Sequence, residues 1–405
     1  MHGLYCRNLD SSPLKLLFSI VLIISVFQTG TCWGAVGSAS VKVLPDWNII
    51  AQKNPTLKTL VVVEAANGLT LRDLAILADQ GLVPADRDPG LIVGMKKAVF
   101  STTAERWINS NLPRHISARV APKFLMSGIY RVSFRVDAKN YDGPLNLGVT
   151  APREDVGKRL ISYDVVVRPT RDLVKHQDSA GNRWVSVKIP RVRYGDEIKF
   201  HFSFTYEVDV ARVIDHDLMM SDKPESEELN EELKEFLKSG YKIDPEIPEA
   251  SKWASVSRSF PVDARQEYRR LDKFLKGKVV YDDAKRAAYF GGRSVYSDLD
   301  HMYQYPSETL SRGLGCCPDT VLLECSFMRA KGIPCRTAGR FGHFFSEVYL
   351  LGRGWKSTST TPTGIPLIVS VGPDHVPYQK WQPAIPIRTT RWEARVRIEP
   401  QEDYQ

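Results

Sequence analysis

Apolar and polar residues alternate strictly in two stretches in the middle of the chain, residues 130–136 and 198–208. A period of two buries one face of a strand and leaves the other in water, which is typical of an antiparallel sheet. A third alternating stretch, residues 185–189, follows the turn residues 178–182 and completes a hairpin-like pattern. We therefore predict a β-sandwich module over residues 115–215, with His201 on its solvated face.

The region before this module predicts a small α/β region over residues 41–114. An apolar, strand-like run covers residues 60–63, and a helical pattern follows over residues 71–78. Residues 104–109 are interpreted as a second short helix. No motif in this region indicates a particular chemistry, so its role stays open.

Residues 216–260 predict a helical connector. A helix start at residues 222–225 is followed by Leu229, Leu233, Phe236 and Leu237 at helical spacing, until Gly240 ends the pattern. The acidic residues between 225 and 235 then form the solvated face of this helix. We assign them no binding role.

From residue 261 to residue 405 the pattern predicts an α+β core. A helix with Ala264, Tyr268, Leu271 and Leu275 on one face precedes a cysteine-rich segment, and short strands follow it. The chain ends in one more alternating strand, residues 392–398, which this division assigns to the core.

Composition limits the class of protein. The 405 residues are 43% hydrophobic and 25% charged, which does not fit a disordered, collagen-like or coiled-coil chain. The net charge of +8 is scattered, and no basic block is interleaved with aromatic residues. We therefore expect no nucleic-acid partner.

The N-terminus predicts a signal peptide over residues 1–35. Arg7 and Lys15 precede an apolar run of twelve positions, residues 16–27, and small and polar residues close it. A membrane anchor is the rival interpretation, but crossing a bilayer takes about 20 apolar residues. We expect an exported protein, periplasmic or secreted, with no stable membrane insertion after removal of the signal.

The cysteine-rich segment, residues 309–332, provides candidate chemistry. Gly313 and Gly315 indicate a tight loop, and Pro318 suits the first position of a helix that ends near Gly332. This spacing predicts Cys317 at the N-cap, where the helix dipole lowers the pKa of a thiol. The candidate base is His343, which opens the predicted strand over residues 343–350.

Two other interpretations of Cys317 remain open at this point. In an exported protein it could be a buried structural thiol or half of a disulfide. A zinc site could use Cys316, Cys317, Cys325, Cys335 and His343. Zinc ligands are usually separated by two to four residues, however, and the adjacent thiols do not fit that spacing.

Four segments closely resemble the core of bacterial transglutaminase-like proteins, over roughly residues 275–362. The segments are residues 315–319, 329–336, 343–350 and 352–355. This resemblance implies a papain-like cysteine-enzyme fold without a metal or organic cofactor, and a peptide or protein as substrate. By position, Cys317 matches the nucleophile and His343 the general base, while Arg336 matches a basic residue that we interpret as structural.

The sequence departs from the family pattern at its third position. The family aspartate falls on Ser359, and residues 355–362 contain no carboxylate. Ser359 or Thr360 could instead accept a hydrogen bond from His343. Glu347 and Asp374 are alternative acids, although Glu347 lies about 13 Å along an extended strand from His343.

Two classes of function therefore stay open. In the first, the protein is a cysteine hydrolase or acyltransferase acting on peptide or amide bonds through Cys317 and His343. In the second, the missing aspartate indicates a degenerate site, and the protein is a binding or scaffold module. Tyr281, Tyr303 and Trp355 either line a cleft or belong to the core, and the oligomeric state stays open.

Overall fold

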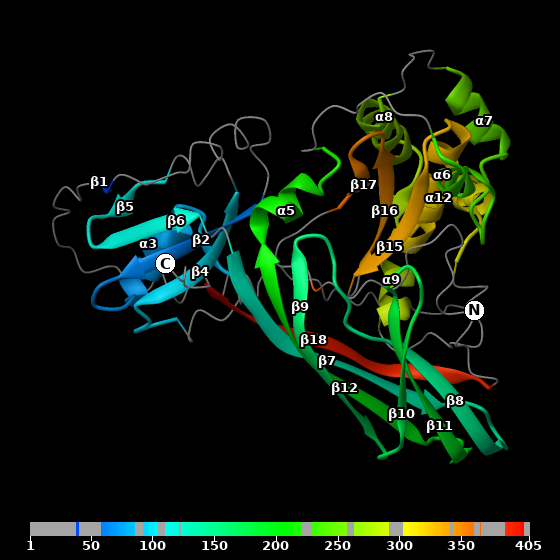
Figure 1. The fold of residues 1–405 in the computed structure, drawn as a ribbon, viewed down its shortest axis with the longest axis horizontal. Coiled ribbons are helices and arrows are strands. Elements are labelled where there is room, and N and C mark those ends of the chain that lie inside the picture. The colour runs from blue at the N-terminus through cyan, green and yellow to red at the C-terminus, as the bar shows by residue number, and fades with distance from the viewer. Residues whose placement is uncertain are drawn as a thin grey trace, which may run out of the picture.

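The computed structural model describes residues 38–39, 58–85, 92–103, 110–120, 123–219, 229–256, 263–290, 303–340, 343–359, 365 and 385–400. The signal peptide predicted over residues 1–35 lies outside these ranges. None of the helices in the described ranges is both long and apolar enough to cross a membrane. Figure 1 shows a small sheet with one helix, a group of long strands, and a mixed helical region above them.

The small N-terminal sheet has the strand order β3-β4-β2-β6. Its elements are β2 (Lys58–Ala65), α3 (Leu71–Asp79), β3 (Val83–Pro84), β4 (Lys97–Thr103) and β6 (Ile116–Val120), and the short β1 (Ser38–Ala39) pairs separately with β5 (Leu112–Pro113). The predicted strand at 60–63 and helix at 71–78 are confirmed. The helix predicted over 104–109 lies outside the described residues.

This sheet extends past the boundary predicted at residue 114. β6 pairs antiparallel with β2, with Val61 opposite Val120. The predicted division had assigned these residues to the following module. The sequence between residues 116 and 120 is short and only weakly alternating, so its period does not specify which sheet it joins.

Two antiparallel sheets follow. One has the order β10-β11-β8 and the other β18-β7-β12-β9. The strands are β7 (Lys123–Val136), β8 (Asp142–Thr150), β9 (Lys158–Arg168), β10 (Leu173–Gln177), β11 (Arg183–Arg193) and β12 (Glu197–Asp209). The hairpin predicted around residues 178–182 is confirmed as β10 and β11.

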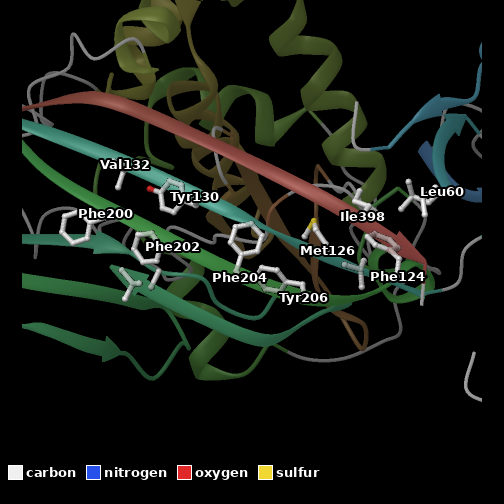
Figure 2. Close-up of a cluster of buried hydrophobic side chains, with 14 of the residues drawn as sticks. Leu60, Phe124, Met126, Tyr130, Val132, Phe200, Phe202, Phe204, Tyr206 and Ile398 are labelled. Atoms are coloured by element: carbon white, nitrogen blue, oxygen red, sulfur yellow. The ribbon is translucent and has the colours of Figure 1, made fainter. Parts of the chain in front are cut away.

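Both sheets contribute to one hydrophobic cluster, which explains the alternation seen in the sequence. Every apolar position from 198 to 208 on β12 is buried, whereas His201 is exposed, as predicted. Figure 2 shows the aromatic side chains of β12 beside side chains of β7. The labelled residues on these two strands are Phe124, Met126, Tyr130, Val132, Phe200, Phe202, Phe204 and Tyr206.

The C-terminal strand, β18 (Ile387–Pro400), belongs to the four-stranded sheet and not to the core that the predicted division assigned it to. It runs antiparallel to β7 along nearly its whole length. Without β18, β7 would be an edge strand with a row of unpaired backbone groups. Gly128 of β7 permits the close approach, since a Cβ there would lie 2.2 Å from the carbonyl oxygen of Arg395.

The connector is less helical than predicted within the described residues. It follows α5 (Val210–Asp215), and it contains the single turns α6 (Glu231–Lys234) and η2 (Glu235–Leu237) and the helix α7 (Pro248–Ser255). The helix start predicted at 222–225 lies outside the described residues, and Asn230 caps α6 instead. Leu233 and Phe236 are buried and the glutamates of α6 are exposed, as the pattern predicted.

The mixed region that follows contains a second hydrophobic cluster. Its helices are α8 (Ala264–Lys276), α9 (Asp283–Phe290), α11 (Pro306–Arg312) and α12 (Cys317–Ala330), and its strands are β13 (Val280–Tyr281), β14 (Leu314–Gly315), β15 (Cys335–Arg340), β16 (His343–Leu350) and β17 (Gly354–Ser357). α12 is buried along almost its whole length and packs against β15 and β16. This packing fixes the first turn of α12 beside the start of β16.

A pair of neighbouring residues on β12 tests this account of the core. Phe202 is fully buried, and His201 is exposed on the opposite face of the same strand. We expect Phe202→Ala to lower the free energy of unfolding by about 3–5 kcal/mol. His201→Ala should change it by less than about 0.5 kcal/mol. Urea denaturation of both variants measures the difference, and equal losses would contradict the assigned faces.

Candidate active site

α12 begins one residue earlier than the sequence predicted. Cys316 is the N-cap, with an extended backbone, and Cys317 is the first helical residue. The carbonyl of Cys316 accepts the first intrahelical bond, from the Thr320 N–H at 3.1 Å. The sequence pattern predicted Pro318 in the first helical position, but a proline is tolerated anywhere in the first turn because those N–H groups have no intrahelical acceptor.

The carboxylate of Asp319 fixes this helix start. Asp319 is completely buried and accepts hydrogen bonds from the Cys316 N–H and the Gln304 N–H, both at 2.9 Å. The Lys285 ammonium contacts both carboxylate oxygens, at 2.8 and 2.7 Å. A buried carboxylate requires such partners because it has lost its hydration. Asp319 therefore joins α9 and the segment just before α11 to the first turn of α12, which carries Cys317.

Two polar groups lie close to the Cys317 sulfur and favour its thiolate. They are the Tyr281 hydroxyl and the backbone N–H of Phe344, the residue directly after His343. β13 pairs parallel with β14, with Tyr281 opposite Gly315, which holds this tyrosine beside the start of α12. The thiol thus lies next to the first residues of β16.

Burial raises the pKa of the Cys317 thiol above its usual value, whereas the sequence predicted a lowered one. Cys317 is only 8% exposed, so the thiolate loses most of its hydration. The nearby Phe344 N–H, Tyr281 hydroxyl and Arg286 guanidinium favour the thiolate but do not outweigh this loss. Burial is the larger cause, and the nearby Cys317 the second, of a rise in the pKa of Tyr281 to about 12.

The His343 imidazole lies at the exposed start of β16 and contacts Ser359. Its Nε2 lies 3.1 Å from the Ser359 hydroxyl oxygen, and its ring stacks on Phe345. Partial loss of hydration and the cationic side chains of Arg340 and Arg286 lower the pKa of His343. The imidazole is therefore neutral at physiological pH.

Several contacts hold Ser359 in place after the end of β17. Its N–H donates to the Ser357 hydroxyl at 3.1 Å, and its carbonyl accepts from the Ser357 hydroxyl at 2.9 Å and from Arg340 Nη1 at 2.6 Å. The preceding residue, Thr358, bonds through its backbone to Ser346 of β16 at 3.0 Å. The serine found at the family's acid position is therefore fixed beside His343.

These contacts define what the arrangement can do chemically. Because Nε2 contacts Ser359, Nδ1 is the ring nitrogen left to act as a base. The described contacts of these two residues include no hydrogen bond between Cys317 and His343. A raised thiol pKa and a lowered imidazole pKa together mean that the resting pair is a neutral thiol and a neutral imidazole.

Glu347 does not act as a substitute acid for His343. Its carboxylate is buried and bonds to Arg336 at 2.7 Å and to His216 at 3.0 Å. Burial alone would raise the pKa of Glu347, but Arg336 and His216 outweigh it and lower the pKa to about 2. Arg336 is thus part of a buried ion pair, consistent with a structural role. The other two alternatives, Thr360 and Asp374, lie outside the described residues.

The four cysteines of the core form no disulfide with one another. Cys325 lies with its sulfur 3.4 Å from that of Cys335, and all four cysteines of the core are free thiols. A disulfide between Cys317 and Cys325 is therefore not present. Within the described ranges, no group of three or more histidine, cysteine, aspartate or glutamate side chains is arranged to hold a metal ion.

Sequence reasoning missed two features of the site. For Tyr281 the sequence left both a cleft and a core role open, but the side chain is 45% exposed and lies beside Cys317, whereas Tyr303 is buried against Phe344. Arg340 was not singled out, although it lies directly opposite His343 across the β15–β16 pair. The two-residue strand containing Tyr281 gives no periodic signal, but Arg340 lies only three residues before His343 in the sequence and could have been noticed.

Comparison with known proteins identifies the class of this region. Residues 254–359 match the family model described as "Transglutaminase-like superfamily". The chain therefore contains a transglutaminase-like superfamily domain, preceded by antiparallel sheets in a mixed α+β fold.

Two solved structures resemble the chain. One, from Cytophaga hutchinsonii, is named "putative cysteine protease"; it is 14% identical, with a TM-score of 0.48 over 70% of this chain and 93% of that one. The other, from Parabacteroides distasonis, is named "putative protease"; it is 11% identical, with a TM-score of 0.24 over 76% of this chain and 58% of that one. A search of the curated proteins found no match.

Restoring a carboxylate at position 359 tests the electrostatics of the imidazole. We expect Ser359→Asp to raise the pKa of His343 by about 1 unit or more, because a nearby anion favours the imidazolium. Ser359→Asn is the matched neutral control and should leave the pKa lowered. Titration of the His343 ring by NMR measures both, and identical titrations would contradict the contact between residues 343 and 359.

Proposed function

We propose that this protein is an exported cysteine hydrolase or acyltransferase that acts on peptide or amide bonds. We infer a papain-like core in which Cys317 is the nucleophile, His343 the general base and Ser359 the residue that orients the imidazole. One arrangement supports this most. The Cys317 sulfur lies beside Phe344 at the start of β16, and the Ser359 hydroxyl contacts Nε2 of the adjacent residue, His343. The preceding antiparallel sheets, which we interpret as a β-sandwich, supply surface for a substrate.

In the proposed reaction, the Cys317 sulfur attacks the carbonyl carbon as His343 takes the thiol proton on Nδ1. The backbone N–H of Cys317, in the first turn of α12, has no intrahelical acceptor and can donate to the developing oxyanion. The C–N bond then breaks, and the imidazolium returns its proton to the leaving amine. Water resolves the thioester in hydrolysis, and a second amine resolves it in acyl transfer. The scheme requires no cofactor.

The neutral resting pair makes this a general-base mechanism. Proton transfer accompanies attack, instead of preceding it as a stable thiolate–imidazolium pair. Ser359 can keep the proton on Nε2 but supplies no negative charge to stabilise the imidazolium. In a serine triad, a neutral group in place of the aspartate lowers turnover by about 10⁴. A thiol is the more acidic nucleophile and depends less on that charge, so we expect slow but measurable turnover.

Product analysis tests the activity directly. The full mature chain is incubated with a peptide library, with and without a primary amine, and hydrolysis and transfer products are identified by mass spectrometry. We expect Cys317→Ala to reduce turnover to below about a thousandth of the wild-type rate. Cys316→Ser is the matched control, because serine is also a good N-cap and leaves the adjacent nucleophile in place. Turnover that survives Cys317→Ala would contradict the proposal.

The pH dependence of the acylation rate follows from the lowered pKa of His343. The base must be unprotonated, and its pKa lies below the usual value of about 6.5. The rate of acylation should therefore rise with pH through a value below about 6.5 and stay level at neutral pH. In Ser359→Asp the rising limb should move to higher pH. A rising limb above pH 8 in the wild-type protein would instead report ionisation of the thiol.

A second function, a degenerate peptide-binding or scaffold module, is favoured by one observation. Burial raises the pKa of Cys317, and the residue that the described part of the chain places at Nε2 of His343 is a neutral serine, Ser359. Such a module would retain the fold, but its Cys317 thiol would react only after losing its proton without help from His343.

Alkylation by iodoacetamide separates the two functions. If His343 assists the thiol, His343→Ala should slow labelling of Cys317 at pH 7 by about tenfold or more. If the site is degenerate, the two proteins should label at the same rate. Cys316→Ser should be used as the background in both cases, so that the label reports Cys317 alone.

A further inference from the structure

A buried ion pair links the antiparallel sheets to the candidate active site. Asp155 lies in the turn between β8 and β9, and its Oδ2 accepts from Arg340 Nε at 3.2 Å and from Arg340 Nη2 at 3.0 Å. The side chains of Asp155 and Arg340 are only 2% and 5% exposed. The other carboxylate oxygen, Oδ1, accepts from the Val156 N–H at 2.9 Å. Asp155 therefore has a fixed orientation within its own turn.

Arg340 also contacts the groups around His343. Its third nitrogen, Nη1, donates to the Ser359 carbonyl at 2.6 Å. Its guanidinium lies 4.4 Å from the centre of the Phe345 ring, on which the His343 ring stacks. Arg340 is also the residue directly opposite His343 between β15 and β16. One guanidinium thus connects Asp155 with both residues that contact the imidazole.

Other charged groups surround this link. Lys158 is completely buried and lies near both Asp155 and Arg340, and Glu347 and His216 also act on Asp155. The cationic side chains that act on His343 are Arg340 and Arg286. Arg340 acts on both Asp155 and His343.

We propose that Asp155 is a positioning residue for His343: it orients Arg340 so that Arg340 holds Ser359 against the imidazole. The antiparallel sheets thereby help to set the geometry of the transglutaminase-like domain. This inference rests on the proposed function, in which His343 is the base, but it concerns a residue that lies about a hundred positions before the matched domain.

The first test follows His343 itself, by NMR titration of the full mature chain, with the ring signal assigned from His343→Gln. Asp155→Asn keeps the size of the side chain but removes the charge that neutralises Arg340. We expect the pKa of His343 to fall by about 0.5 unit or more in Asp155→Asn, and to rise by a similar amount in Arg340→Met, which removes the cation. The matched control is Asp142→Asn, which removes an exposed ion pair with Arg191 and should change nothing.

The second test is a double-mutant cycle on turnover of the peptide found in the product analysis. Asp155→Asn and Arg340→Met should each lower kcat about tenfold and leave KM within about twofold. The double variant should lose no more than either single variant, because both changes break one chain of contacts. Arg340→Lys keeps the charge but cannot bridge Asp155 and Ser359, so it should lower kcat while leaving the His343 titration close to wild type.

The outcomes separate this inference from the proposed function. If the protein has no turnover, the proposed function fails, and the NMR titration still decides whether Asp155 acts on His343. If the folded Asp155→Asn and Arg340→Met variants both titrate as wild type, or if their losses of kcat add, the positioning role is wrong. If Asp155→Asn does not fold, Arg340→Lys decides: wild-type kcat in that variant overturns the proposal.

Discussion

The burial of α12 is the constraint on which the site depends. A helix packed on almost all sides cannot shift along its axis without breaking contacts with β15 and β16. Its start is fixed further by the Asp319 carboxylate, which must keep its bonds to Cys316, Gln304 and Lys285 because an unpartnered buried charge costs several kcal/mol. The position of the Cys317 sulfur is a consequence of these two requirements.

The same burial determines the charge state of the pair. A helix N-terminus stabilises an anion by about 0.3–1 kcal/mol, whereas burial can shift a pKa by several units, each worth about 1.4 kcal/mol. Burial therefore outweighs the helix dipole, and the pKa of the Cys317 thiol is raised. At His343, burial is again the larger cause, and the guanidinium groups of Arg340 and Arg286 also disfavour the charged form. A carboxylate at position 359 would oppose that preference, so the serine and the neutral imidazole are mutually consistent.

The sequence predicted those parts of the fold that local pattern determines. Alternation identified the buried faces of β7 and β12, and helical spacing with flanking glycines located α12 to within a residue. The family register gave Ser359 as one of several candidate partners of His343, and the structure brings these two residues into contact. Period two specifies which face of a strand is buried but not which strand lies beside it, so the pairing of β18 with β7 was missed. The thiol pKa was missed because burial of the first turn depends on distant segments.

The contacts between the transglutaminase-like domain and the segments before it also join residues that are far apart in the sequence. The residue after α5, His216, accepts the Ser357 N–H at 2.8 Å, and the Ser357 carbonyl accepts the Leu218 N–H at 2.8 Å, so the chain leaving β12 flanks β17. The family match ends at Ser359, yet the groups that hold β17 and Ser359 include segments well before residue 254. The matched domain therefore contains the candidate nucleophile and base, but the fixed position of Ser359 depends on residues outside it.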